Sequence, residues 1–123
     1  MKKTKGQIED ALGKAFIQFY VQKLGTGPKN ARVYILEDMI IARLTGRLHP
    51  LEDFLIHEKK GIELVKHIRK AFQEATIKDL NKVIKKHIEC EVISFHSDSS
   101  TKTGERFEIF IVDRNLSEYF KNS

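Results

Sequence analysis

The sequence contains little of the chemistry that enzymes and disulfide-bonded proteins depend on. Cys90 is the one cysteine in 123 residues, which excludes an intrachain disulfide. Neither a Cys-x-x-Cys pair nor a zinc-type spacing of cysteine and histidine is present. Gly-x-Ser-x-Gly, His-Glu-x-x-His and Cys-His nucleophile patterns are also absent. We therefore predict a protein with no enzymatic activity, no bound metal and no cofactor.

Long apolar runs are missing as well. Runs such as residues 39–42 are far shorter than the roughly 18 residues that a membrane-spanning helix needs. Residues 1–5 are basic, but the segment that follows carries Glu9 and Asp10, so it has no apolar signal core. We expect a cytoplasmic protein without a transmembrane segment.

The composition is typical of one small globular domain, with 41% hydrophobic and 32% charged residues. We assign residues 1–123 to a single domain with its core over residues 6–113, a basic arm at 1–5 and a tail at 114–123. The formal net charge is +5, and its excess gathers in the arm at Lys2, Lys3 and Lys5. We interpret this charge mainly as support for solubility.

The first half of the chain predicts a helix followed by a β-hairpin. Thr4 and Gln7 have the spacing of a capping box, and apolar residues recur at helical spacing up to residue 24. Residues 31–48 then change to β-rich runs on either side of Glu37 and Asp38, which indicates an antiparallel hairpin that turns at these two acids.

Five glycine and proline residues have predicted structural roles. Gly25 suits the C-cap of the first helix, and Gly27 with Pro28 stops that helix. Gly46 ends the second strand, and Pro50 suits the first position of the next helix.

A long helical region follows Pro50, and Gly61 predicts a break or bend in it. Up to Thr76 its apolar stripe consists of Ile62, Val65, Ile68, Phe72 and Ala75. After Thr76 a second stripe, rotated by roughly a third of a turn, consists of Ile77, Leu80, Val83, Ile84 and Ile88. The helix either kinks near Thr76 or turns its two halves toward different neighbours.

The last third predicts strands over residues 91–95 and 107–112, joined by a polar loop over 96–105, and a short helical turn after Leu116. The resulting order, α-β-β-α(α)-β-β, predicts an α+β fold of two layers. An antiparallel four-stranded sheet would carry the helices on one face. Its bare second face, together with the wide apolar surface of the first helix, suggests a homodimer.

Arg69, Ser97 and Asp98 are candidate ligand-binding residues. Arg69 lies between apolar residues, and a partly buried guanidinium needs a carboxylate or carbonyl partner, for which Asp98 and Asp113 are available. Alternatively, its stem packs while its head reaches water. Ser97 and Asp98 begin a hydroxyl-rich segment that could bind an ion or could simply cap turn amides.

A lysine stripe on the long helix suggests nucleic acid as an alternative partner. Its members are Lys78, Lys82, Lys85 and Lys86. Asp79 interrupts the stripe, and aromatic residues are not interleaved with it as a single-strand platform requires. An ordinary solvated helix face would look the same, so we regard nucleic-acid binding as the weaker hypothesis.

Four segments in this order and spacing give the chain a family resemblance over about residues 6–113. They are residues 25–28, 44–52, 64–72 and 95–98, which read GTGP, LTGRLHPLE, LVKHIRKAF and FHSD. The sequence resembles the MpsC-like family, a bacterial domain of unknown function. His49, where a capping Thr is expected, and Glu89-Cys90, where Thr-Gly is usual, depart from that pattern at helix ends.

The resemblance implies a small cytosolic accessory to a sodium-translocating, membrane-potential-generating system, and it brings no catalytic residues. We therefore predict a non-enzymatic, homodimeric interaction protein, associated with a membrane ion or bicarbonate system through a membrane-protein partner. The second hypothesis is a nucleic-acid-binding regulator that uses the basic helix at residues 66–86. The third is a small-anion sensor that uses Arg69, Ser97 and Asp98.

Overall fold

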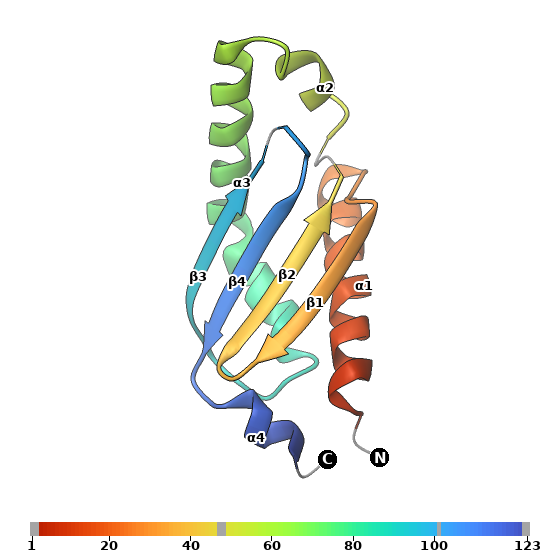
Figure 1. The fold of residues 1–123 in the computed structure, drawn as a ribbon, viewed down its shortest axis with the longest axis vertical. Helices are drawn as coiled ribbons and strands as arrows, with labels where there is room; N and C mark the ends of the chain where they lie inside the picture. The colour runs from red at the N-terminus through yellow and green to blue at the C-terminus, as the bar shows by residue number, and fades with distance from the viewer. Residues whose placement is uncertain (1–2, 47–48, 101, 122–123) are drawn as a thin grey trace.

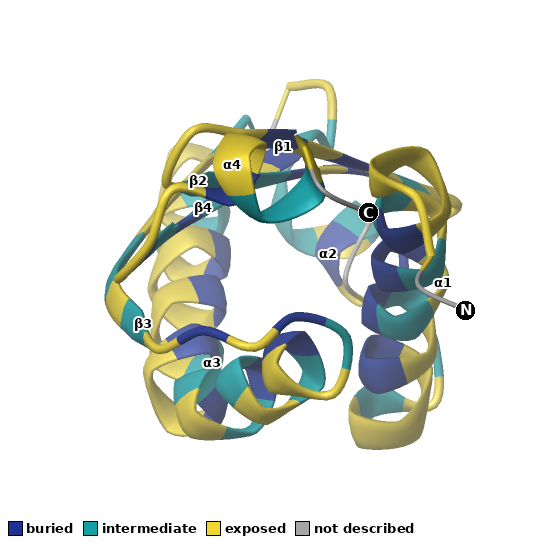
Figure 2. Cartoon of the chain, turned by 90° about the horizontal axis from the view of Figure 1, so that it is seen from below, coloured by how far each residue is buried: buried dark blue, intermediate teal, exposed yellow. Residues whose placement is uncertain are grey.

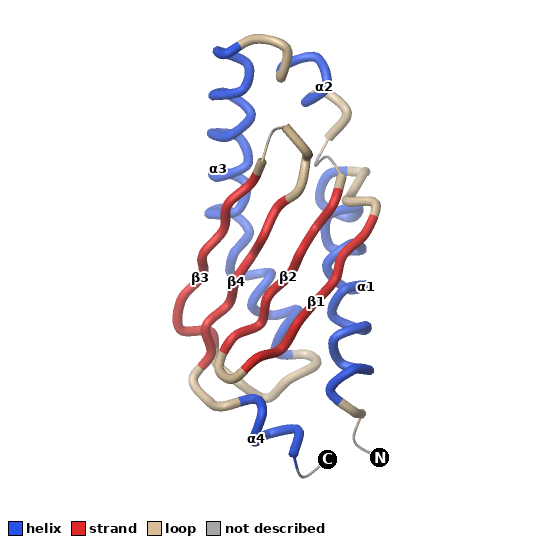
Figure 3. Tube along the Cα trace, in the orientation of Figure 1, coloured by secondary structure: helices blue, strands red, loops and turns tan. Residues whose placement is uncertain are grey.

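The computed structural model, which describes residues 3–46, 49–100 and 102–121, contains one antiparallel sheet of four strands in the order β1-β2-β4-β3. Helices α1 and α3 cover one face of this sheet, and among the described elements none covers the other (Figures 1 and 2). Figure 3 separates the helices from the strands in the same view. The elements in chain order are α1 (Lys5–Leu24), β1 (Asn30–Leu36), β2 (Met39–Thr45), α2 (Glu52–Leu55), α3 (Lys59–Lys85), β3 (Val92–Ser99), β4 (Arg106–Val112) and α4 (Leu116–Lys121). The predicted two-layer α+β fold is confirmed.

Helix α1 begins and ends where its capping residues predict. The Gln7 amide donates to Thr4 Oγ1 over 3.2 Å, and Gln7 Oε1 accepts from the Thr4 amide over 2.8 Å. Gly25 closes the helix in the left-handed conformation, with φ of 77°. The buried face of α1 packs on the sheet, where Phe16 stacks on Phe110 with ring centroids 5.7 Å apart.

Helix α1 also occupies the outer edge of β1. At Gly13 an ideal Cβ would lie only 2.8 Å from the Ala31 carbonyl oxygen, so the missing side chain permits this close approach. Lys5 Nζ donates to the Ile35 carbonyl over 3.2 Å, and the Ile35 amide donates to Glu9 Oε2 over 2.8 Å. Side chains of α1 therefore take the place of a neighbouring strand at Ile35.

The hairpin of β1 and β2 turns at Glu37, whose φ is 56°. The pairing of β2 with β4, which the sequence did not predict, places the second hairpin beside the first. Residues of both hairpins alternate between the helix-covered face and the uncovered face. Leu116 of α4 is buried, and its amide donates to the Glu37 carbonyl over 2.7 Å, which fixes α4 at the end of the sheet.

The buried face of α3 differs from the prediction. Its buried residues form one stripe along the helix, namely Val65, Arg69, Gln73, Thr76, Leu80 and Ile84. Ile68, expected in the core, is 47% exposed. The second predicted stripe does face the core, since Leu80, Ile84 and Ile88 are buried. The first is wrong except at Val65, because the core-facing side of the first half of α3 is polar.

Thr76 lies where the sequence suggested a kink. Its Oγ1 donates to the Phe72 carbonyl over 2.7 Å, a bond between residues four apart that tends to bend helices. The α-helix is continuous through this point, and Figure 1 shows it changing direction along its length.

Two predicted boundaries also need correction. The helical region is interrupted at residues 56–58 and not at Gly61, which lies in the first turn of α3. An ideal Cβ on Gly61 would lie 1.6 Å from the Leu55 carbonyl oxygen, so this glycine allows the end of α2 to pack there. Pro50 precedes α2, which begins at Glu52, so it is not the first helical residue.

Strand β3 extends to Ser99 and includes residues 96–99, which were expected in a loop. These polar residues pair in register with β4 up to Ser99 opposite Arg106. Because β3 is an edge strand beside polar groups of α3, its side chains need not be apolar. In the described part of the chain, no helix has the length and hydrophobicity needed to cross a membrane.

The close contact of α1 with β1 predicts that Gly13→Ala destabilises the fold by about 1–3 kcal/mol, because the added methyl meets backbone. The control is Gly6→Ala in the same helix, where nothing lies within 4 Å of the added methyl. This control should be neutral or stabilise the protein by up to about 1 kcal/mol. Urea unfolding measures both free energies, and similar values for the two variants would contradict the described contact.

Candidate functional site

Polar side chains fill the core where the first half of α3 faces β4. We call this group the polar cluster. Its members are Tyr20 of α1, Glu52 of α2, Arg69 and Gln73 of α3, Ser97 of β3, and Arg106 and Glu108 of β4. All except Ser97 are buried. Buried charges are costly unless they are paired, so each member depends on its neighbours.

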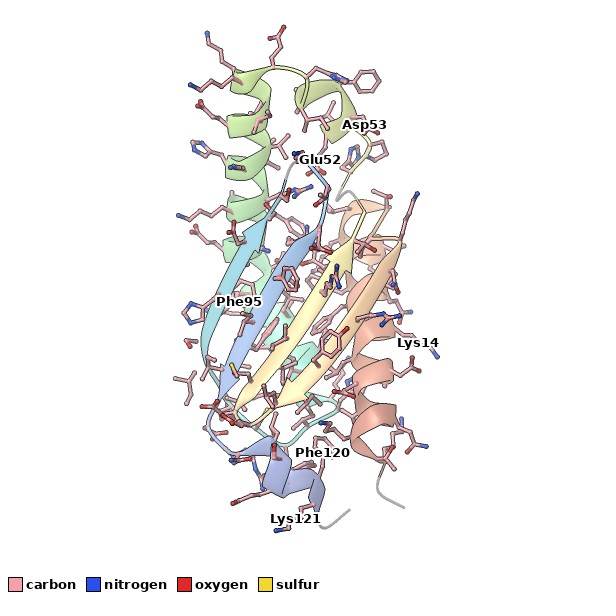
Figure 4. The ribbon with its side chains drawn as sticks, in the orientation of Figure 1. Lys14, Glu52, Asp53, Phe95, Phe120 and Lys121 are labelled. Carbon is pink, nitrogen blue, oxygen red and sulfur yellow. The ribbon has the colours of Figure 1, made fainter. Side chains whose placement is uncertain are left out.

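Arg69 and Glu52 form one buried ion pair of the cluster. Arg69 Nε donates to Glu52 Oε2 over 2.9 Å, and Arg69 Nη2 donates to Glu52 Oε1 over 2.8 Å. The two parallel bonds match the planar guanidinium to the planar carboxylate. Figure 4 shows Glu52 at the end of the sheet below α2. The pair therefore attaches α2 to α3.

Glu108 accepts most of the remaining hydrogen bonds. Its Oε2 accepts from Tyr20 Oη over 2.5 Å and from Gln73 Nε2 over 3.0 Å. Burial, and next the charge of Glu108, raise the pKa of Tyr20, so its phenol stays protonated and acts as a donor. Ser97 donates to Gln73 Oε1, which extends the connection to β3. The Arg106 guanidinium lies over the Tyr20 ring, 4.7 Å from its centroid.

Three buried atoms of the polar cluster lack a hydrogen-bond partner among the described residues. They are Arg69 Nη1, Arg106 Nε and Glu108 Oε1. Arg106 Nε lies 3.7 Å from Glu108 Oε2, which is too long for a hydrogen bond. Leaving such a group unpaired costs about 1–3 kcal/mol, so these three atoms are the least satisfied part of the polar cluster.

A cavity of about 650 Å³ lies between α3 and β3, beside the polar cluster. Both buried arginines line it, and the exposed Lys66 and Lys70 add two more cations. The other lining residues are Gln73, Glu74, Ile77, Phe95, His96, Ser97, Asp98 and Ser99. This volume is within the usual range for small-molecule sites. Glu52 and Glu108 compensate the two arginines, so the exposed Lys66 and Lys70 are the cations that would draw an anion toward this cavity, while Glu74 adds one negative charge to its lining.

A smaller cavity of about 290 Å³ is also lined by Arg69. It is lined by Glu52, by Lys29 and Gly46 near the ends of the first hairpin, and by Gly104. The guanidinium of Arg69 thus borders two cavities. A ligand in the larger one would share Arg69 with Glu52.

The structure brings the three predicted ligand-binding residues to the rim of one cavity. Arg69 and Gln73 line it from α3, and Ser97, which donates to Gln73 Oε1, lines it from β3. Asp98 borders the cavity, but it pairs in register with Phe107, so its side chain lies on the opposite face of β3 from Ser97. The expected partners of Arg69, Asp98 and Asp113, are wrong, because Glu52 binds it.

Sequence reasoning missed Glu52, Gln73, Arg106 and Glu108. The sequence did contain a signal for Arg106 and Glu108, because successive side chains of a strand point to opposite faces of the sheet. Arg106 and Glu108 lie at even positions with Phe110 and Val112, and these four share the buried face of β4. A strand face that begins with two charged residues and ends in apolar ones predicts a core that is polar at one end.

The other predicted residues have simpler surroundings. The exposed lysines of the predicted stripe lie on α3 and at its C-cap, and none lines the cavity between α3 and β3; they are Lys78, Lys82, Lys85 and Lys86. Lys85 Nζ lies 2.7 Å from Glu91 Oε1. In the described ranges, no group of three or more His, Cys, Asp or Glu side chains is placed to hold a metal ion.

The remaining structural residues act in turns, as their types suggest. At Gly27 an ideal Cβ would approach the Ile17 carbonyl oxygen to 3.2 Å, and Pro28 beside it is buried. Gly46 has φ of 100°, which favours glycine, and an ideal Cβ there would lie 2.9 Å from the Lys29 amide nitrogen.

Comparisons with known proteins identify relatives of the chain. The family model described as Na+-translocating membrane potential-generating system (MpsC) matches residues 4–114. A protein of Bacillus subtilis (strain 168), named Uncharacterized protein YbcI, is 38% identical over 116 residues, which cover 94% of this chain and 94% of that protein. No solved structure matches significantly. The matched residues include the whole polar cluster and all lining residues of the larger cavity.

The buried ion pair predicts a strong dependence of Arg69 on its partner. Glu52→Leu should destabilise the protein by about 3–5 kcal/mol, because it leaves the guanidinium uncompensated. Glu52→Leu combined with Arg69→Met should recover most of this loss. Urea unfolding of the two single variants and the double variant completes the cycle, and additive losses would contradict the pairing.

The single thiol gives a prediction about reactivity. Burial, and next the nearby charge of Asp113, raise the pKa of Cys90 to about 11. At pH 8 the thiolate that reacts with iodoacetamide is therefore scarce in the folded protein. Alkylation should be roughly 100-fold slower in buffer than in 8 M urea, as followed by mass spectrometry. Equal rates would mean that Cys90 is accessible and ionised.

Proposed function

The chain belongs to the MpsC family, and we propose that it is a non-enzymatic accessory protein that binds a small organic anion in the cavity between α3 and β3. One observation carries this proposal. Two buried guanidinium groups line the same cavity, and each retains a nitrogen without a partner among the described residues. Arginine cannot lose its charge in a protein, so both groups stay positive at any physiological pH and keep donors beyond those that their carboxylate partners use.

The lining also indicates the class of ligand. A carboxylate presents two oxygens in the plane that guanidinium nitrogens match. Ile77 and Phe95 add apolar surface to the same cavity, which favours an organic acid with a small hydrophobic part over an inorganic ion. Lys66 and Lys70 are exposed on α3 and would attract the anion toward the buried groups.

The description of the matched family concerns a sodium-translocating system that generates membrane potential. We place the protein in the cytoplasm as an accessory to such a system, in contact with a membrane-protein partner. The polar cluster joins side chains of α1, α2, α3, β3 and β4, so occupation of the cavity would be sensed across the fold. A small-anion sensor is the role that this geometry supports best.

Ligand titration tests the proposal with benzoate as the probe and benzamide as its neutral analogue. At low ionic strength, benzoate should raise the melting temperature by several degrees at concentrations well above Kd, and benzamide should not. Calorimetric titration should give one site per chain. No stabilisation by benzoate, acetate or phosphate would mean that the cavity holds water only. Equal stabilisation by benzamide would mean that the cavity does not select an anion, and either result would overturn the proposal.

Variants locate the bound probe. Arg106→Lys keeps the charge but loses the planar fork, and it should weaken benzoate binding roughly tenfold or more. Lys70→Gln at the cavity should weaken it about threefold. Lys82→Gln removes the same charge from the same helix away from the cavity and should leave binding unchanged. If Arg106→Lys does not fold, Ser97→Ala at the rim of the cavity replaces it as the test. Unaltered benzoate binding in Lys70→Gln and in whichever of these two variants folds would refute this site.

A further inference from the structure

The sheet face that the helices leave uncovered is apolar over most of its area, and Figure 1 looks onto it. Tyr34, Leu36 and Phe107 are 43%, 52% and 38% exposed on it. Their apolar neighbours on the same face are Met39, Ile41, Ile109 and Ile111. An antiparallel sheet that faces water on one side normally carries polar residues there. This face is therefore suited to contact with another protein surface.

The strand register arranges the outward residues in three rows across the sheet. Written from β1 through β2 and β4 to β3, the rows are Leu36, Met39, Ile111, Ser94; then Tyr34, Ile41, Ile109, His96; then Arg32, Arg43, Phe107, Asp98. The first two rows carry no Asp, Glu, Lys or Arg. The third row has its positive charges on β1 and β2 and its negative charge on β3.

This distribution is self-complementary under one symmetry. A two-fold axis that lies between the two sheets, parallel to the strands and between β2 and β4, sets β1 over the partner's β3. Each row then faces the same row of the second copy. Arg32 lies opposite the partner's Asp98, and Ile41 lies opposite the partner's Ile109. Arg43 lies opposite the partner's Phe107 and keeps its counter-charge from Glu105 of its own chain. We propose that the uncovered face binds a second copy of this chain in this arrangement.

The other in-plane two-fold axis, perpendicular to the strands, gives poor chemistry. It would set the charged third row against the first row, so that Arg32 meets the partner's Leu36. Taking a guanidinium out of water without a counter-charge is strongly unfavourable. Arg32 forms no ion pair within the described part of its own chain, so it is available to the partner's Asp98. The charged row thus selects the axis parallel to the strands.

Pairing of sheets edge to edge through β1 is a different mode, which α1 obstructs. Lys5 and Glu9 already bind the outward amide and carbonyl of Ile35, and Gly13 lies close to Ala31. Stacking of the two faces at the usual separation of about 10 Å involves no strand edge. The strands of the two copies would then be nearly aligned, as in a β-sandwich.

The size of the face predicts the strength of the dimer. Four strands about 4.8 Å apart and seven residues of about 3.3 Å each give a footprint of about 440 Å² per copy. Both copies together bury about 900 Å², below the roughly 1,200 Å² typical of stable interfaces. We therefore expect a reversible dimer with a dissociation constant in the micromolar range, independent of whether the cavity binds an anion.

Sedimentation equilibrium of the full chain tests this, with loadings from low micromolar to several hundred micromolar. The average mass should rise from monomer to dimer over that range. Ile109→Glu in the second row should raise the dissociation constant roughly 100-fold or more, while circular dichroism stays unchanged because the site is on the outer face. A monomer at the highest loading, or an unaltered dimer in Ile109→Glu, would overturn the proposal.

Charge exchange tests the proposed axis. Arg32→Asp and Asp98→Arg should each weaken the dimer about tenfold, because every contact occurs twice under two-fold symmetry. The double variant, and an equimolar mixture of the two single variants, should restore association. Lys78→Asp on α3 is the matched charge reversal away from the face and should have no effect. A dimer that survives both single variants, or is not restored by the exchange, would show another interface.

Discussion

The fold depends on the neutralisation of two guanidinium groups that α3 and β4 carry into the core. Neither Arg69 nor Arg106 can become neutral by losing a proton, so the chain must supply carboxylates at both places. Glu52 meets Arg69, and Glu108 lies beside Arg106. The short helix α2 owes its position largely to the first of these pairs. The pair adds to the close packing of α2 on α3 at Gly61, and Val65 of the same part of α3 is buried.

These charges divide the interior into two unlike halves. Toward α4, the core is apolar, with Leu80 and Ile84 of α3 against Phe110 and Val112 of β4. Toward α2, the same helix and strand present Arg69, Gln73, Arg106 and Glu108. The apolar half supplies nonspecific stabilisation from buried area. The polar half fixes how the helices are oriented on the sheet, because its hydrogen bonds tolerate few geometries. The cavity also lies in this half.

The sequence is informative where burial coincides with hydrophobicity. Thr4, Gln7 and Gly25 mark α1 correctly because caps depend on local chemistry alone. Reasoning from hydrophobic periodicity fails in α3, since it takes Ile68 as buried and does not recognise Gln73 as part of the core. Glu52 carries no local signal of its role, because its partner lies 17 residues away and is brought near only by the interruption after α2. The alternation in β4 did contain the missing information, since Arg106 shares a face with Phe110.

The attachment of α1 to β1 has a consequence for association beyond pairs. Fibres grow from β-sheets when each added chain presents a fresh edge to the next one. Here Lys5 and Glu9 satisfy the outer groups of Ile35, so the sheet is obstructed at its β1 edge, and β3 is its other edge strand. Two such sheets could join once through β3, after which both outer edges would be obstructed. The chain thus carries a terminator against polymerisation, made from two side chains of its own first helix.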